Sequence, residues 1–132
     1  MIYLASPYWD PSPAVRHQRF RAACRATIKL MRAGQFVFSP VVHGHSLATF
    51  GAPVEWDFWQ PHDLEHLRRC DEVVVLTLGN WQDSLGVAAE IRRARELGKP
   101  IRHIAPDDAD VGPTSRPATE SNQSGHSRSG AF

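Results

Sequence analysis

The residue whose type and position best suit chemistry is Glu90. The periodicity after Asp83 predicts a helix over 84–97, and Glu90 falls inside its apolar stripe of Val87, Ile91, Ala94 and Leu97. Burying an unpaired carboxylate costs on the order of several kcal/mol, so such a group is usually paired, protonated or set in a polar cleft. The start of a helix after a strand is also where open α/β sheets bind ligands. Glu90 is therefore the leading candidate for a catalytic group.

A second acid, Asp63, strengthens this reading. In a predicted helix over 61–70, Asp63 shares a side with Leu67 and Cys70, so two acids project from helices that flank the same strand, 72–78. Two converging carboxylates suit glycosidic-bond chemistry, one as nucleophile and one as acid/base, and retaining enzymes hold theirs roughly 5–5.5 Å apart. Alternatively, Asp63 is a helix-start residue favoured by the helix dipole, which would not explain Glu90.

The elements that must position these acids alternate between strand and helix. We predict strands over 2–5, 35–39, 72–78 and 100–104, and helices over 14–33, 61–70 and 84–97, with 41–60 irregular. This alternation predicts an α/β fold with a parallel sheet in the order 2-1-3-4, helices on both faces and a possible fifth strand. Its switch point would gather Tyr3, Ser6, Asp63, Ser84 and Glu90 around one cleft.

Composition limits the organisation and the partners. The 132 residues predict one domain over 1–105, followed by a polar stretch, 106–132, that we expect to be disordered. The net charge of +1 with mixed charges argues against binding a nucleic-acid polymer. No apolar run reaches membrane length, and the first strand leaves no room for a signal peptide. With Cys24 and Cys70 read as free thiols, we expect a cytoplasmic protein.

Histidines and aromatic residues supply further candidates. His43 and His45 follow the second strand and, with His62 and His66, permit a zinc hypothesis. No cysteine joins them at ligand spacing, so we favour a polar contact from His43 and His45 to a base or sugar, without metal or cofactor. The segment 56–59 is Trp-Asp-Phe-Trp, and Asp57, Trp59, Tyr8 and Trp9 are placed in the same pocket. Its rings either stack on a nucleobase or cover a sheet edge or dimer interface.

Several short motifs together resemble the nucleoside 2-deoxyribosyltransferase superfamily, over residues 1 to about 104. They are Tyr3-Leu-Ala-Ser-Pro7, Asp63-Leu64, Cys70-Asp-Glu-Val-Val-Val75, Trp81-x-x-Ser84-x-Gly86-x-x-x-Glu90 and Ala94-x-x-x-Gly98-Lys-Pro-Ile101. The chain looks most similar to the small, mostly uncharacterised bacterial and phage branches. The resemblance implies a flavodoxin-like, Rossmann-like sheet and a homodimer or larger assembly in which a neighbouring subunit completes the site.

The resemblance also implies roles for individual residues. Glu90 would attack the anomeric carbon and release the base, Asp63 would transfer protons to and from the base, and Tyr3 would position the nucleophile. Ser84 stands where transferases acting on free nucleosides carry Asp, and where the family's nucleoside 5′-monophosphate N-glycosidases carry a phosphate-contacting Ser. A Ser at a helix N-terminus suits an anion, but it is equally an ordinary N-cap.

A second departure from the pattern of the monophosphate enzymes argues against phosphate binding. The monophosphate enzymes carry a Gly- and Arg-containing loop after the first strand, whereas this chain has Ser-Pro-Tyr-Trp-Asp-Pro-Ser-Pro at 6–13, with Arg16 and Arg19 as the nearest cations. The substrate is thus expected to be a small nucleoside or nucleotide, bound by Ser6, Tyr8, Ser84 and Gly86 among others. Two alternatives remain: a non-catalytic nucleotide-sensing module, and an enzyme cleaving the nicotinamide glycosidic bond as Toll/interleukin-receptor-like domains do.

Overall fold

Four parallel strands form a single sheet in the order β2-β1-β3-β4, as predicted. The structure is a computed structural model that describes residues 1–111. The strands are β1 (Ile2–Ala5), β2 (Val37–Phe38), β3 (Glu72–Leu76) and β4 (Ile101–Ile104). The helices are α1 (Pro13–Arg32), α2 (Pro40–Ala48), α3 (Trp56–Arg69), the 3-10 turn η1 (Trp81–Asp83), α4 (Leu85–Glu96) and the short α5 (Asp108–Val111).

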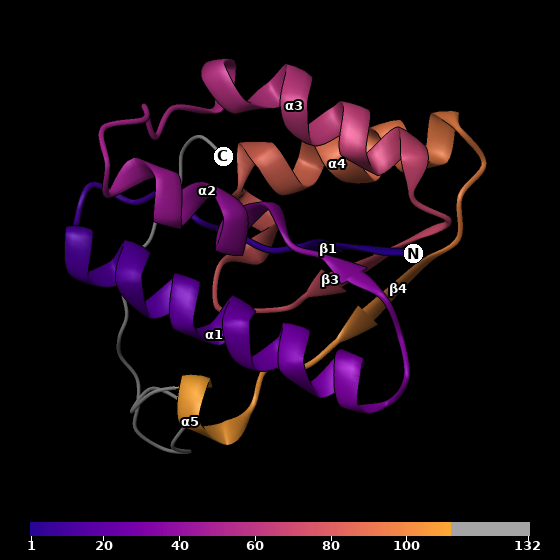
Figure 1. Cartoon of the computed structure of the whole chain (residues 1–132), viewed down its shortest axis with the longest axis horizontal. Coiled ribbons are helices and arrows are strands. Elements are labelled where there is room, and N and C mark those ends of the chain that lie inside the picture. Colours follow the sequence, from indigo (N-terminus) through magenta and orange to yellow (C-terminus); the bar gives the residue numbers. More distant parts are fainter. Residues whose placement is uncertain (112–132) are drawn as a thin grey trace.

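Helices cover both faces of this sheet (Figure 1). Ile2 and Leu4 of β1 turn one way and pack with α1, whereas Tyr3 and Ala5 turn the other way, towards the layer formed by α3 and α4. The central strand β3 is buried from Val73 to Leu76, as expected for a parallel strand covered on both sides. Tyr3 therefore lies beneath the helices that carry the two candidate acids.

Serine caps begin three of the helices. Ser12, Ser39 and Ser84 each accept a hydrogen bond from a backbone N–H three residues later, which satisfies one of the donors left free at a helix start. Pro13 and Pro40 follow the first two caps directly, where the missing N–H of proline costs nothing. These local signals set where α1, α2 and α4 begin.

The prediction that 41–60 is irregular is wrong. Pro40–Ala48 forms α2, and α3 begins at Trp56 instead of at Pro61. Pro61 was read as a first-turn residue, but it lies inside α3 as its sixth residue, where packing outweighs the helix bond that proline cannot donate. Asp63 is consequently the eighth residue of α3, too deep for the helix dipole to explain its position.

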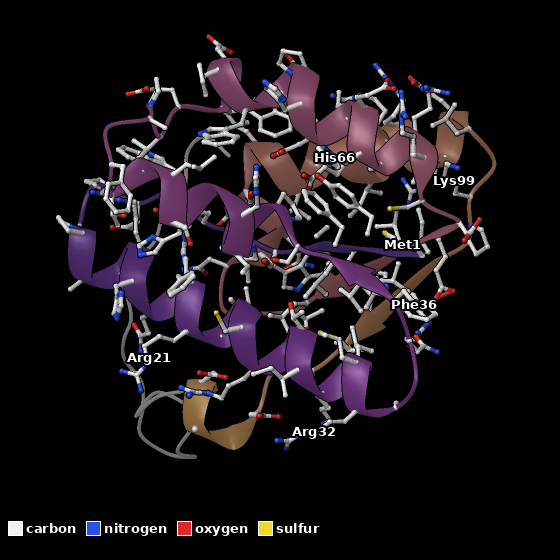
Figure 2. All side chains as sticks on the ribbon, in the orientation of Figure 1. Met1, Arg21, Arg32, Phe36, His66 and Lys99 are labelled. Carbon is white, nitrogen blue, oxygen red and sulfur yellow. The ribbon has the colours of Figure 1, made fainter. Side chains whose placement is uncertain are left out.

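The inward face of α1 is made mainly of small residues. Two of its larger apolar residues, Ile28 and Met31, lie on the outer side and are 48% and 57% exposed. The buried residues are instead Arg19, Ala22, Ala23, Ala26 and Leu30. The helix presents its small alanines to the sheet, which allows a close approach. On its outer side Arg32 points away from the molecule (Figure 2).

The first residues of the stretch 106–132, which the sequence predicts to be disordered, include the short helix α5. Arg25 of α1 holds Asp110 of α5 with an Nη2–Oδ1 distance of 2.9 Å, so Asp108–Val111 docks on α1 and forms no fifth strand. Residues 112–132 of the predicted tail lie outside the described part, and the domain boundary at 105 stays a prediction. Among residues 1–111, no helix is both long and apolar enough to cross a bilayer.

Candidate active site

Tyr3 and Glu90 meet between the sheet and the helix layer. The hydroxyl of Tyr3 donates a hydrogen bond of 2.6 Å to Oε2 of Glu90, across 87 residues of sequence. Tyr3 is 0% exposed and Glu90 2% exposed, so this contact is shielded from water. A carboxylate that accepts a short hydrogen bond in a dry environment is oriented and partly stabilised in its ionised form.

Asp63 approaches the same pair from α3. It is 1% exposed, and its Oδ2 atom has no hydrogen-bond partner in the described structure. Burial alone raises its pKa from 3.8 to about 8. A buried oxygen without a partner is costly in a folded protein, and such atoms recur where a ligand or reacting group completes the contact. At neutral pH, Asp63 is therefore mostly protonated and able to donate a proton.

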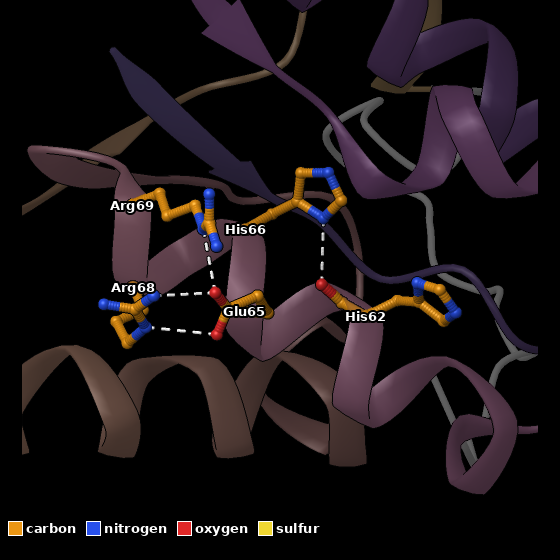
Figure 3. Close-up of polar contacts among 5 residues, drawn as sticks. All are labelled: His62, Glu65, His66, Arg68 and Arg69. Atoms are coloured by element: carbon orange, nitrogen blue, oxygen red, sulfur yellow. Dashed lines mark hydrogen bonds and ion pairs between the residues drawn. The ribbon is translucent and has the colours of Figure 1, made fainter.

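A second acid of α3, Glu65, shows how strongly the surroundings of a carboxyl group determine its pKa. Glu65, two residues on, faces solvent and is held by Arg68 and Arg69 at 2.7 and 2.8 Å (Figure 3). These arginines lower the pKa of Glu65 to about 2. The pKa of Asp63 moves in the opposite direction because α3 turns it into the protein with no cation beside it.

Charge couples the three buried groups. Burial raises the pKa of Glu90 well above its usual value, the charge of Asp63 raises it further, and the Tyr3 hydrogen bond lowers it. Burial and the two acids likewise raise the pKa of Tyr3, so its phenol stays protonated and remains a donor. Burial thus favours the neutral form of both acids, and because their charges interact, the two carboxyls titrate as a coupled pair.

Ser6 directly follows β1, and Ser84 directly precedes α4, so each is next to an element that carries one residue of this cluster. Ser6 follows β1, is 4% exposed, and its Oγ finds no hydrogen-bond partner among the described residues. Ser84 is 3% exposed and its Oγ accepts the Val87 N–H at 3.1 Å, so it is an N-cap of α4. Gly86 is buried in the first turn of the same helix. The Ser84 hydroxyl proton is not used by the cap and can still be donated.

The predicted histidine contacts fall into two places on α2. The Tyr8 hydroxyl lies 2.7 Å from Nδ1 of His45, whose ring stacks on Phe20 with centroids 4.2 Å apart. His43 is exposed and meets the edge of Trp59, with ring centroids 6.2 Å apart. Within residues 1–111, no group of three or more His, Cys, Asp or Glu side chains is arranged to hold a metal ion.

The aromatic segment divides between core and surface. Trp59 is 3% exposed and donates its indole N–H to the Pro53 carbonyl at 2.7 Å, which fixes the chain before α3. Asp57 is exposed in the first turn of α3, and Phe58 is 45% exposed. Trp59 thus packs as a core residue here, and its contact with a base stays a prediction, as does that of Asp57.

Sequence reasoning missed Phe38. It pairs in register with Tyr3, its ring lies 6.0 Å from the Tyr3 ring, and it stacks on His66 at 4.1 Å. His66 projects from α3 towards the sheet (Figure 2). The predicted order 2-1-3-4 already placed the second strand beside Tyr3, so aligning the two strands would have revealed this neighbour.

Comparisons with known proteins bear on the fold and the family of the chain. A solved 2-deoxyribosyltransferase from the psychrotolerant bacterium Bacillus psychrosaccharolyticus, described as a biocatalyst for nucleoside synthesis, is similar to the chain. The TM-score is 0.55 and the identity 27%, over 79% of this chain and 71% of that chain. This likeness supports the predicted kinship with the 2-deoxyribosyltransferase superfamily. No curated protein matches the chain. A family model described as a domain of unknown function, DUF1937, matches residues 1–105. The chain therefore belongs to the DUF1937 family.

Proposed function

We propose that the protein cleaves the N-glycosidic bond of a 2′-deoxynucleoside, a nucleoside or a nucleoside 5′-monophosphate through a covalent glycosyl-enzyme. The observation that carries this proposal is the buried hydrogen bond from Tyr3 to Glu90, with Asp63 beside it. Two buried acids whose charges interact, one of them oriented by a phenol, suit the needs of a retaining glycosidase. The similarity to a 2-deoxyribosyltransferase suggests the sugar and the bond.

In the first step, a carboxylate oxygen of Glu90 forms a bond to C1′ of the sugar. The bond between C1′ and the base nitrogen breaks, and its electron pair leaves with the base. Asp63, protonated because burial raises its pKa to about 8, gives its proton to the departing base directly or through water. The positive charge that develops at C1′ lies next to Glu90, which stabilises the transition state before capturing the sugar.

In the second step, an acceptor releases the enzyme. The Asp63 carboxylate takes a proton from water or from a second base, the acceptor oxygen or nitrogen bonds to C1′, and the ester bond to Glu90 breaks. Both side chains return to their starting states. Water as acceptor makes the protein a hydrolase, and a base as acceptor makes it a transferase.

The contacts proposed for the rest of the substrate follow the edge of the sheet. Ser6, with an unused buried hydroxyl, suits the sugar, and Ser84 with the free N–H groups of α4 suits a 5′-phosphate. Tyr8, His43, His45, Asp57 and Trp59 are proposed contacts to the base or sugar, and Gly86 gives the backbone close access. Within its superfamily, we place the chain near the small bacterial and phage branches that resemble nucleoside 5′-monophosphate N-glycosidases.

The test is release of free base, followed by chromatography, from a panel of nucleosides, deoxynucleosides, their 5′-monophosphates and NAD. Base released from a deoxynucleoside or its monophosphate, and lost in Glu90→Gln, supports the proposal. Release from NAD alone would instead indicate a nicotinamide glycohydrolase. Binding of a nucleotide with no release from any substrate, and with affinity unchanged in Glu90→Gln, would indicate a sensing module and contradict the proposed chemistry.

A further inference from the structure

A hollow lies on the side of α4 that turns away from Glu90. It encloses about 370 Å³, and its walls include Trp81 and Gln82 of η1 and Val87, Ile91, Arg92 and Arg95 of α4. At 100° per residue, the α4 positions that line it centre roughly 130° around the helix from Glu90. The hollow is therefore separate from the candidate active site.

The walls combine a flat aromatic surface with an apolar floor. Val87 is 1% exposed and belongs to the core, and Ile91 packs against it, so the base of the hollow is rigid. The ring of Trp81 packs against the ring of His103 of β4, with centroids 5.3 Å apart and a tilt of 57° between the planes. An indole fixed in this way offers a preformed face or edge to another planar ring.

The rim carries cations that have no partner. Arg92 and Arg95 make no hydrogen bond or ion pair with any described residue, whereas Arg93 between them is held by Glu96 at 3.1 Å. Residues three apart on a helix have Cβ atoms about 5–6 Å from each other, so both guanidinium groups can reach one anion. The helix dipole accounts for basic residues near the end of α4, but not for the tryptophan and apolar floor beside them.

We propose that this hollow binds a small planar aromatic ring that carries a phosphate or carboxylate group. The ring lies against Trp81 over Val87 and Ile91, and the anionic group is held by Arg92 and Arg95. The Gln82 side chain donates to or accepts from the edge of the ring. The volume lies within the range of pockets for such ligands, about 300–1,000 Å³. Nothing in this site depends on the chemistry proposed for Glu90.

Titration of the full-length protein tests the site, with the indole N–H signals followed by NMR. Trp81→Phe identifies the signal of Trp81 by its loss. Adenosine 5′-monophosphate and salicylate probe the phosphate and carboxylate forms of the ligand, and adenosine supplies the ring without charge. We expect the Trp81 signal to shift with at least one anion, and adenosine to bind at least tenfold more weakly than its monophosphate.

Arginine variants locate the anion. Arg92→Gln and Arg95→Gln should each weaken binding at least tenfold, whereas Arg93→Gln, which removes the same charge from the same helix, should leave it unchanged. The proposal is overturned if millimolar concentrations of both anions leave the Trp81 signal in place, or if its shift survives in Arg92→Gln and Arg95→Gln. It is also overturned if these variants change the protein's mass in solution while no anion binds, because a second copy would then cover the hollow.

Discussion

The hydrogen bond from the Tyr3 phenol favours the ionised form of the Glu90 carboxyl, whereas burial favours the neutral form. A hydrogen bond to a charged group contributes on the order of 1.5–3 kcal/mol, and one pKa unit corresponds to about 1.4 kcal/mol. The Tyr3 hydrogen bond therefore offsets part of the pKa rise that burial imposes on Glu90. If a proton resides on Asp63, the repulsion from that neighbour also disappears. The nucleophile depends on both neighbours.

At this scale the sharpest prediction is that Glu90→Gln abolishes base release. The substitution keeps the size and most hydrogen bonding of the side chain but removes its nucleophilic charge, so the rate should fall by several orders of magnitude. Glu96→Gln is the matched control, since Glu96 belongs to the same helix but lies exposed and paired with Arg93. More than about a tenth of the wild-type rate in Glu90→Gln, with unchanged stability, would exclude the covalent mechanism.

Asp63 predicts an unusual dependence of stability on pH. Its folded pKa of about 8 exceeds its ordinary 3.8, so the folded state binds the proton more tightly than the unfolded state between those values. The free energy of unfolding should then fall as pH rises from about 4 to about 8, by at most about 1.4 kcal/mol per pH unit from this residue. Glu90 acts in the same direction.

Urea unfolding at pH 5, 6, 7 and 8 measures this slope, which should be smaller in Asp63→Asn. Glu65→Gln serves as the control, because its pKa of about 2 places its own contribution below this window. An identical slope in wild type and Asp63→Asn would show that Asp63 is not protonated in the folded protein at neutral pH.

At the scale of elements, predictability depended on whether a local signal was unambiguous. The order of the strands followed from their alternation with helices and from the buried run Val73–Val75, and the inward direction of Glu90 followed from the helical period. The start of α3 could not be predicted in this way. Pro61 indicates the first turn of a helix, and only tertiary packing stabilises the helical residues that precede it. The Ser39–Pro40 cap of α2 is also visible in the sequence, but the prediction places Ser39 in a strand and leaves 41–60 irregular.

The Ser84 hydroxyl caps α4, and in the proposed function it also contacts the substrate. Removing the N-cap by Ser84→Ala should cost about 1 kcal/mol of stability, as should Ser39→Ala at the matched cap of α2. If Ser84 also contacts a phosphate, only Ser84→Ala should raise KM for a deoxynucleoside 5′-monophosphate, by about tenfold, relative to the free deoxynucleoside. Equal changes in KM for the two substrates would leave Ser84 as a cap alone.

At the scale of the whole molecule, apolar side chains gather in sequence where α2 passes into α3. Leu47, Phe50 and Phe58 are 43%, 92% and 45% exposed, beside the buried tryptophans of α3. Exposed apolar side chains of this kind favour association with another protein surface. Neither the partner nor the geometry of an assembly can be deduced from a single chain, because both depend on a second surface.

We predict a homodimer with its sites near this surface. Light scattering at tens of micromolar should give a mass of about twice 14.8 kDa. Phe50→Asp should shift the mass towards that of one chain, because it places a charge on the apolar surface. Phe36→Asp, at another residue that is 76% exposed, should not. A monomer in the wild type at this concentration would contradict the prediction.

The central place of β1 also has a consequence for synthesis on the ribosome. Ile2 pairs with Val37 on one side and with Glu72 on the other. One edge of β1 therefore stays unpaired until β3, which begins 70 residues later in the chain, has been made. At 5–20 residues per second, that delay is roughly 4–14 s. Until residue 63 is made, Tyr3 can have neither Asp63 nor Glu90 as a neighbour, and an apolar strand edge is open to pairing with other chains. The strand that anchors the candidate site is thus exposed to aggregation while the rest of the sheet is being made.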